Sequence, residues 1–307
     1  MGRGGRLPMM RSVLPVLTVV AVILAAWYAA CVPMNAQWTR DQAARAGVEL
    51  SLAELVADTM AQARPRLPAP HQVAVELWNT TWVEERHGRR GLWNTGTLSN
   101  RSLIFHGWVT LSATLLGFAI GTGLGILLAV GIVHNRAMDQ SVMPWAIASQ
   151  TIPILALAPM IIVVLNAVGI SGLIPKAIIS AYLSFFPVVV GMVKGLRAPD
   201  AMQLDLLKTY NASRVQTFFR LRLPASMPYL FASLKVGIAA AIVGAIVAEL
   251  PTGAVAGLGA RLLSGSYFGQ TLQIWSALFA AAILAASLVG LVGLIQRITL
   301  SRMGMAR

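Results

Sequence analysis

The feature that most limits the fold of this chain is a series of apolar runs, each close to the length that crosses a lipid bilayer. The runs occupy residues 13–31, 108–133, 143–165, 174–193, 229–250 and 273–296. A helix needs ~20 apolar residues to span the hydrocarbon core, and helices satisfy their own backbone groups there. The sequence therefore predicts an all-α, polytopic membrane protein with about six spans. The fourth span is the weakest, because Ser184 and Pro187 interrupt it.

The composition excludes most soluble classes of protein. Hydrophobic residues make up 57% of the chain and charged residues 11%, whereas soluble domains contain about 25% charged residues. The net charge of +13 does not indicate a nucleic-acid partner, because no basic stripe interleaves with aromatic residues on a soluble domain. We expect the lipid bilayer of the inner (plasma) membrane as the surroundings of the chain, and no nucleic-acid partner.

The basic residues predict one orientation, because cytoplasmic loops carry an excess of Lys and Arg. Those that support it are Arg3, Arg6, Arg11, Arg136, Arg297, Arg302 and Arg307, together with the basic loop 194–222. The N-terminus, the C-terminus and the loop 194–222 are therefore expected in the cytoplasm. The segment 32–106 is expected outside.

We divide the chain into four parts on this basis. Residues 1–31 are a cytoplasmic tail and the first span, and 32–106 form an extracytoplasmic segment. Residues 107–297 are the core of membrane helices with a cytoplasmic loop at 197–227, and 298–307 are a cytoplasmic tail. Within 32–106, Ser51 and Glu54 form a capping box that predicts an amphipathic helix. That helix is expected to dock on the membrane domain or the outer leaflet, or alternatively to contact a partner.

The cytoplasmic loop 205–224 has a more specific pattern than its charge. Leu206, Leu207 and Tyr210 share one face of a short helix. Asn211 follows, and Asn is the commonest residue other than Gly to tolerate a positive φ where a helix ends. The pattern predicts a helix, a turn and a second helix that together protrude from the membrane.

The second helix of this loop has its own signals. Ser213 can cap it, and Phe218 and Leu221 lie within it. Pro224 is predicted to end it, and Pro228 to begin the next membrane helix.

The loop resembles the cytoplasmic "EAA" loop of ABC importer permeases. The family pattern is Glu-Ala-Ala, three residues, Gly, nine residues, Ile, one residue and Leu-Pro. With Leu223 and Pro224 as the Leu-Pro pair, Leu221 takes the Ile position and Asn211 the Gly position. The Glu-Ala-Ala positions hold Asp205, Leu206 and Leu207. The spacing matches throughout, and the run from 225 to 249 is similar to the nitrate/sulfonate/taurine branch, so that the resemblance covers roughly 107–296.

The resemblance implies the fold of a type I ABC importer permease and an ATP-driven import of a small solute, such as nitrate, a sulfonate, taurine or a pyrimidine. It implies two ABC ATPase subunits, an extracytoplasmic solute-binding protein and a second permease subunit, identical or different, as partners. By the same resemblance, the ATPase-coupling residues are Asp205, Leu206, Leu207, Lys208, Thr209, Tyr210, Asn211, Ala212, Ser213, Phe218, Leu221 and Pro224.

No catalytic constellation is visible, so we expect a transporter subunit and not an enzyme. The four His residues show no metal-ligand spacing, and the chain has one Cys. No Gly-Lys-Ser/Thr loop that could cradle phosphate is present. We therefore expect no cofactor and no metal, and an energised transporter built on this chain must use a separate ATPase.

A translocation path or gate is expected near Gln150, Asn166, Glu249 and Arg261. Pro residues bend the third and fourth spans there, which is tolerated where backbone lines a cavity. Glu249 is interpreted as the partner of Arg261 in a structural ion pair or external gate, or alternatively as a contact of the solute.

Two further patterns leave alternatives open. Gly117, Gly121 and Gly125 allow close approach of another helix, either within the chain or in a dimer. We identify Lys235 and Glu249 as the ionisable residues at membrane depth. The alternative function, a secondary transporter or channel without an ATPase, is disfavoured because such proteins usually place ionisable residues in mid-membrane.

Overall fold

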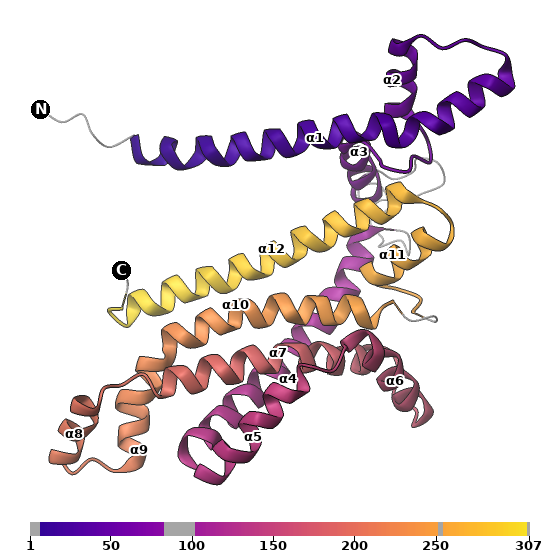
Figure 1. Ribbon diagram of the computed structural model, residues 1–307. Coiled ribbons are helices and arrows are strands. Elements are labelled where there is room, and N and C mark those ends of the chain that lie inside the picture. The colour runs from indigo at the N-terminus through magenta and orange to yellow at the C-terminus, as the bar shows by residue number, and fades with distance from the viewer. Residues whose placement is uncertain (1–6, 83–101, 251–253, 306–307) are drawn as a thin grey trace, which may run out of the picture. The chain divides into compact units, whose positions relative to one another are not determined.

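The computed structural model describes residues 7–82, 102–250 and 254–305, which contain helices and no strand (Figure 1). The chain forms two compact units. The N-terminal unit comprises Met1–Ser102 and Leu262–Phe279, and the core unit comprises Leu103–Arg261 and Ala280–Arg307.

The helices follow one another in this order. The N-terminal unit contains α1 (Leu7–Ala46), α2 (Leu52–Ala61) and α3 (Pro70–Thr81). The core unit contains α4 (Leu103–His134), α5 (Arg136–Ser149), α6 (Ile154–Ala167), α7 (Leu173–Leu196), α8 (Ala201–Thr209), α9 (Arg214–Thr217), the π-helix η1 (Phe218–Arg222) and α10 (Leu223–Ala248). Two helices run through both units, α11 (Leu258–Tyr267) and α12 (Thr271–Arg302).

Five helical stretches are long and apolar enough to cross a membrane, and the bent pair α5–α6 would make a sixth span. The five are Leu14–Ala46, Leu103–His134, Leu173–Leu196, Arg214–Ala248 and Thr271–Arg302. The predicted all-α, polytopic architecture with about six spans is therefore confirmed.

The predicted third span, 143–165, is not one straight helix. It is the end of α5 and most of α6, which are bent by 98° at the break between them. Pro153 lies at this break as the N-cap of α6. It has no N–H to continue a helix, and it restricts the residue before it to extended backbone.

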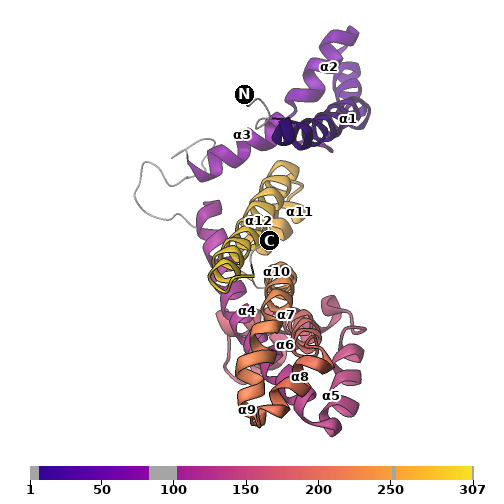
Figure 2. The same ribbon diagram turned by 90° about the vertical axis from the view of Figure 1, so that its left-hand side faces the viewer.

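The fourth span is predicted to be interrupted at Ser184 and Pro187, but α7 is continuous through both residues. The hydroxyl of Ser184 donates to the carbonyl of Ala181, 3.2 Å away, and is buried. Helix α7 packs against both α4 and α10 (Figure 2). Tertiary contacts on two sides therefore hold the helix together where local sequence signals predict an interruption.

Small residues form the contact between α4 and α7. A Cβ at Gly117 would overlap the Cβ of Ser180 and the carbonyl oxygen of Ala177. One turn later, a Cβ at Gly121 would overlap the hydroxyl of Ser184. The packing interpretation of this glycine series is therefore confirmed, and α7 of the same chain occupies the glycine face.

The N-terminal unit is built on α1, which continues past the predicted end of the first span at residue 31. The loop after α2 docks on α1 through Asn35, which is fully buried. Its side-chain oxygen accepts the backbone N–H groups of Arg66 at 2.9 Å and Leu67 at 3.1 Å. Its amide donates to the carbonyls of Leu67 at 2.9 Å and Thr59 at 3.2 Å, so one side chain satisfies four backbone groups.

Helix α2 begins at the predicted capping box. The backbone N–H and the hydroxyl of Ser51 donate to one carboxylate oxygen of Glu54, at 2.9 and 2.7 Å. These hydrogen bonds lower the pKa of Glu54. A hydrogen bond of 2.7 Å from Thr39 on α1 to Asp58 on α2 shows that this helix packs on α1. The helix is therefore docked on the extension of α1, and its docking on the membrane domain or the outer leaflet stays a prediction.

We predict that Gly117→Ala destabilises the core unit, because the new methyl group meets the backbone of α7. Overpacking of a tight contact costs roughly 1–3 kcal/mol. The measurement is the thermal unfolding midpoint of the detergent-purified protein. Gly123→Ala is the matched control, since a Cβ at Gly123 on the same helix meets nothing within 4 Å. An unfolding midpoint for Gly117→Ala equal to that of the control would contradict the prediction.

Candidate functional site

Helix α8 and the residue that caps its end carry an apolar stripe that the described part of the chain leaves uncovered. Met202, Leu206 and Tyr210 follow at helical spacing, and their exposed fractions are 82, 56 and 75%. None of the residues of α8 is buried. A short helix cannot hold its shape in water by propensity alone, and an exposed apolar stripe marks a contact surface. Helix α8 therefore has the character of a docking element.

The turn after α8 has the predicted geometry. Asn211 has a φ of 53°, and it is the only residue other than Gly with positive φ in the described part of the chain. Its backbone N–H donates to the carbonyl of Lys208 at 2.9 Å, and that of Ala212 donates to Leu207 at 3.0 Å. These bonds complete the end of α8, so Asn211 sets the angle between α8 and the next helix.

The second helix begins as predicted but does not end as predicted. The backbone N–H of Gln216 donates to the hydroxyl of Ser213 at 3.2 Å. The prediction that Pro224 ends this helix and Pro228 begins the next one is wrong, since Arg214–Ala248 is one helical stretch. Pro224 is the second residue of α10 but lies inside this stretch, just after η1, and as a proline it donates no N–H to the preceding turn. The wider turn of η1 before it takes up the change in hydrogen bonding.

Phe218 anchors the base of this protrusion and does not belong to the exposed stripe. It packs against a buried cluster of α4 and α7 that includes Ile132 and Met192. Its ring also meets the ring of His134 edge-on, with centroids 5.5 Å apart. Its neighbour Phe219 is 60% exposed. Of the two adjacent rings, one therefore packs on the core and the other lies at the surface.

Polar contacts strengthen the same base. The guanidinium of Arg222 donates to the carbonyl of Leu196 at 3.3 Å, which joins η1 to the end of α7. Arg197 and Asp139 form an ion pair at 2.9 Å, which joins that end to α5. The protrusion of α8 and α9 (Figure 1) is therefore fixed at its base to α4 and α7, and the end of α7 is fixed in turn to α5.

The other predicted loop residues line the surface of the protrusion. Lys208 and Asp205 form an exposed ion pair at 2.8 Å on α8. The hydroxyl of Thr209 donates to the carbonyl of Leu206 at 2.7 Å. Five predicted residues are half-buried: Leu207, Ala212, Phe218, Leu221 and Pro224.

At the opposite end of α10, the carboxylate of Glu249 is fully buried. The hydroxyl of Thr110 on α4 lies 3.0 and 2.9 Å from its two oxygens. The backbone N–H of Gly259 donates to Oε2 at 3.0 Å, and the ammonium of Lys176 on α7 lies 3.7 Å from Oε1. A buried carboxylate is tolerated only when it is paired and hydrogen-bonded, and here α4, α7 and the first turn of α11 meet this need.

The loop before α11 is shaped around this carboxylate. Gly257 has a φ of +129°, and a Cβ there would overlap the carboxylate of Glu249. The backbone N–H of Gly257 donates to Nδ1 of His106 at 3.0 Å, and that of Leu258 donates to the hydroxyl of Thr110 at 2.9 Å. The ammonium of Lys176 also donates to the carbonyl of Ala256 at 2.9 Å. The arrangement fastens α4, α7 and α10 to one loop.

Lys176 is the residue that the sequence analysis missed. It is the third residue of the apolar run 174–193, so its charge within a predicted span was a signal that could have found it. The predicted pairing of Glu249 with Arg261 stays a prediction. The backbone N–H of Arg261 donates to the carbonyl of Gly257 at 3.1 Å, next to the same carboxylate.

The remaining predicted path residues lie in different places. Asn166, near the end of α6, lines a pocket of about 350 Å³ together with Lys176, and so lies close to the Glu249 cluster. Gln150 is the C-cap of α5, at the other end of α6 across the break. The structure therefore brings Asn166 and Glu249 to one region and places Gln150 elsewhere.

Comparison with known proteins settles the family. Residues 121–304 match the family described as binding-protein-dependent transport system inner membrane component. The chain belongs to this family. It is accordingly a multi-pass inner-membrane permease of the ABC importer type and not an enzyme, and the family implies ATPase and binding-protein partners.

Relatives of this permease carry several solute names. It is 31% identical over 232 residues to the riboflavin transport system permease protein RibX of Chloroflexus aurantiacus, which covers 76% of this chain and 78% of RibX. It is 34% identical to the formylaminopyrimidine transport permease protein ThiX of Halalkalibacterium halodurans over 52% of this chain and 62% of ThiX. It is 27% identical to the nitrate import permease protein NrtB of Synechocystis over 61% of this chain and 64% of NrtB.

A solved structure shares the fold. The inward-facing MetNI methionine ABC transporter contains a chain with a TM-score of 0.52 and 22% identity, covering 64% of the permease and 95% of that chain. The predicted type I importer fold is therefore confirmed.

We predict that Lys176→Met destabilises the permease, because it leaves the buried carboxylate of Glu249 without its cation. Removal of one partner of a buried pair costs roughly 3 kcal/mol or more. The thermal unfolding midpoint in detergent should fall, and the double variant Lys176→Met with Glu249→Gln should recover part of the loss. Lys194→Met is the control, since this exposed lysine lies on the same helix. An equal shift in the control would show that the pair is not responsible.

Proposed function

We propose that this permease is driven by a separate ATPase that docks on the loop 205–224, and that it imports a small solute delivered by an extracytoplasmic binding protein. The observation that carries the proposal is the uncovered apolar stripe of α8 on a rigidly anchored base. A transporter that relied on an ion gradient would have no need of such a surface.

The stripe has the features of a binding hot spot. Tyr210 offers a large ring with a polar tip, and aromatic residues dominate the energy of protein interfaces. Met202 and Leu206 extend the apolar area along one side of α8. The ion pair of Asp205 and Lys208 lies outside this stripe on α8.

The base of the loop gives the docking surface a mechanical connection to the membrane. The helical stretch Arg214–Ala248 runs from the turn at Asn211 to the cluster at Glu249. A displacement of α8 by the ATPase therefore acts on α10 directly, and on α7 through Arg222 and Phe218. This supports coupling of ATP hydrolysis to a movement of the core helices.

The family supports a proposal about the assembly. We propose two permease subunits, identical or different, with two ATPase subunits, and cytoplasmic N- and C-termini, which the basic loops favour. The relatives are named for riboflavin, a formylaminopyrimidine and nitrate, which supports a small solute such as a pyrimidine, nitrate, a sulfonate or taurine. The path or gate is proposed beside Asn166 and Glu249, with Gln150 and Arg261 as further members.

We predict that Leu206→Ala combined with Tyr210→Ala removes the ATPase from the complex. Loss of two hot-spot side chains costs more than about 2 kcal/mol, a factor of ~30 in affinity. The measurement is co-purification of an ATP-binding subunit from native membranes. Lys208→Ala, on the opposite face of α8, is the control that should retain it. Retention of the ATPase by the double variant would contradict docking at this stripe.

We predict that Asn211→Pro abolishes ATP-driven uptake, because proline cannot adopt the positive φ of this turn. Asn211→Gly should keep activity, since glycine adopts positive φ without strain. The measurement is solute uptake into vesicles with and without ATP for each variant. Membrane insertion of each variant is measured as the control. Normal ATP-dependent uptake by Asn211→Pro would contradict a rigid coupling turn at this residue. Uptake that persists without ATP and follows an ion gradient would favour a secondary transporter.

A further inference from the structure

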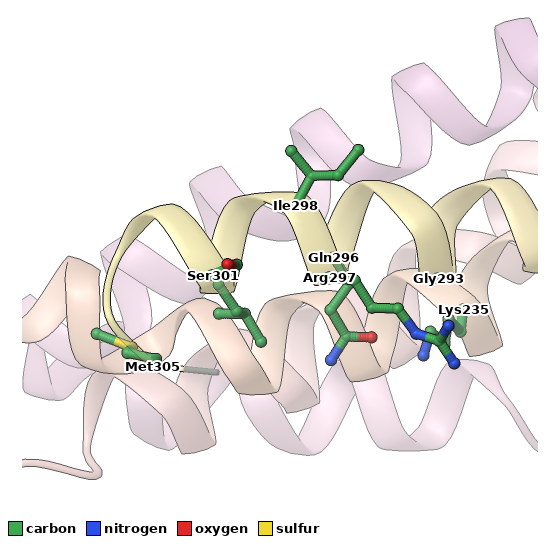
Figure 3. A pocket seen from close by; sticks show the side chains of 8 residues that line it. Lys235, Gly293, Gln296, Arg297, Ile298, Ser301 and Met305 are labelled. Atoms are coloured by element: carbon green, nitrogen blue, oxygen red, sulfur yellow. The ribbon is translucent and has the colours of Figure 1, made fainter. Parts of the chain in front are cut away.

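A further polar feature of the core unit is a cationic pocket between α10 and α12, which shares no residue with the coupling loop (residues 205–224) or with the Glu249 cluster. Its volume is about 620 Å³. Two cations, Lys235 of α10 and Arg297 of α12, line it together with the polar side chains of Gln296 and Ser301 and with Ile298 and Met305. Figure 3 shows Lys235 and Arg297 among the residues that line this pocket.

The two cations have no carboxylate near them along their own helices. Neither α10 nor α12 contains Asp or Glu, and Glu249 lies one residue beyond the far end of α10. The other acidic residues in the described part of the core unit are Asp139, Asp200 and Asp205. Asp139 pairs with Arg197 and Asp205 with Lys208, and Asp200 is the N-cap of α8. Like charges that face one pocket repel each other, so the pocket favours an anion between them.

The position of Lys235 is fixed by helix packing. Its Cε and Nζ lie 3.5 and 3.7 Å from the place of a Cβ at Gly293, so the side chain extends across α12 where that helix has no side chain. Lys235 is half-buried, and burial of an ammonium group without a counter-ion is costly. Because the Lys235 side chain extends across Gly293, its ammonium group lies at the pocket.

We propose that this pocket binds the phosphate group of an anionic phospholipid. A soluble phosphate has the same chemistry, but the pocket opens between two membrane-spanning helices and close to the end of one of them. Basic pockets between membrane helices are typical sites for anionic headgroups. Ile298 and Met305, 48 and 38% exposed, add an apolar surface for the acyl chains. Arg297 and Lys235 hold the phosphate, and Ser301 and Gln296 supply hydrogen-bond donors.

The proposal does not depend on the identity of the solute or on the docking of an ATPase. It concerns a part of the core unit that shares no residue with the coupling loop or the Glu249 cluster. Co-purification of the ATPase can therefore succeed or fail independently of lipid binding, and the two experiments are separable.

The test is native mass spectrometry of the full chain, purified in detergent with whatever subunits accompany it. After delipidation, the protein is titrated with dioleoylphosphatidylglycerol, dioleoylphosphatidylcholine or inorganic phosphate. We expect preferential retention of phosphatidylglycerol. Lys235→Gln and Arg297→Gln should each weaken that retention about fivefold, the effect of one basic contact at a membrane surface. Lys235→Arg keeps the charge and should restore binding.

Arg302→Gln is the matched control, since Arg302 lies on the same helix and does not line the pocket. It should leave retention unchanged. Unchanged retention in the Lys235→Gln and Arg297→Gln double variant, with a single elution peak that shows intact folding, would overturn the site. Equal retention of the two lipids, or displacement of the phosphatidylglycerol by inorganic phosphate, would overturn the lipid as its ligand.

Discussion

The close contact of α7 with α4 and α10 is the interaction on which the rest of the core depends. Helices in lipid gain little from burial of apolar surface, so their association rests on tight packing and interhelical polar contacts. Gly117 and Gly121 bring α4 against Ser180 and Ser184, and Gly244 brings α10 against Ser180 from the other side. One helix is thereby held between two others, and its ends are fixed as a consequence. At one end of α7, the carbonyl of Leu196 accepts a hydrogen bond from Arg222 at the base of the coupling loop. At the other end, the ammonium of Lys176 forms an ion pair with Glu249.

The Glu249 cluster does by polar contacts what the glycine series does by packing. A fully buried carboxylate would be costly by itself, and Thr110, Gly259 and Lys176 offset that cost from three different segments. The same groups therefore specify which segments must come together. The positive φ of Gly257 belongs to this arrangement, because a side chain there would occupy the volume of the carboxylate. The cluster lies at the end of α10 that is far from the coupling loop.

Sequence reasoning succeeded where the signal is local. The capping residues Ser51 and Ser213 and the turn at Asn211 depend on neighbours a few positions away, and the structure has them as predicted. It failed where tertiary contacts or a change of helix type decide: α7 continues through Pro187, and η1 leads past Pro224 into α10. The exposure of Phe219 and the anchoring of Phe218 are likewise set by the cluster on α4 and α7. The contact of Lys176 with Glu249 joins residues of two spans, so only their packing could place them together.

The continuity of α9, η1 and α10 changes what the coupling loop can do. A proline break at Pro224 would have left α8 and α9 as a separate pair joined to the span by a flexible link, which transmits little force. A continuous helix instead transmits a displacement along its whole length. The π-turn of η1 is the one stretch between Arg214 and Ala248 with the wider hydrogen-bonding pattern, and such turns are frequent at functional sites. Phe218 and Arg222 contact α4 and α7 within this turn, so the proposed coupling would carry a movement of α8 into the core helices through it.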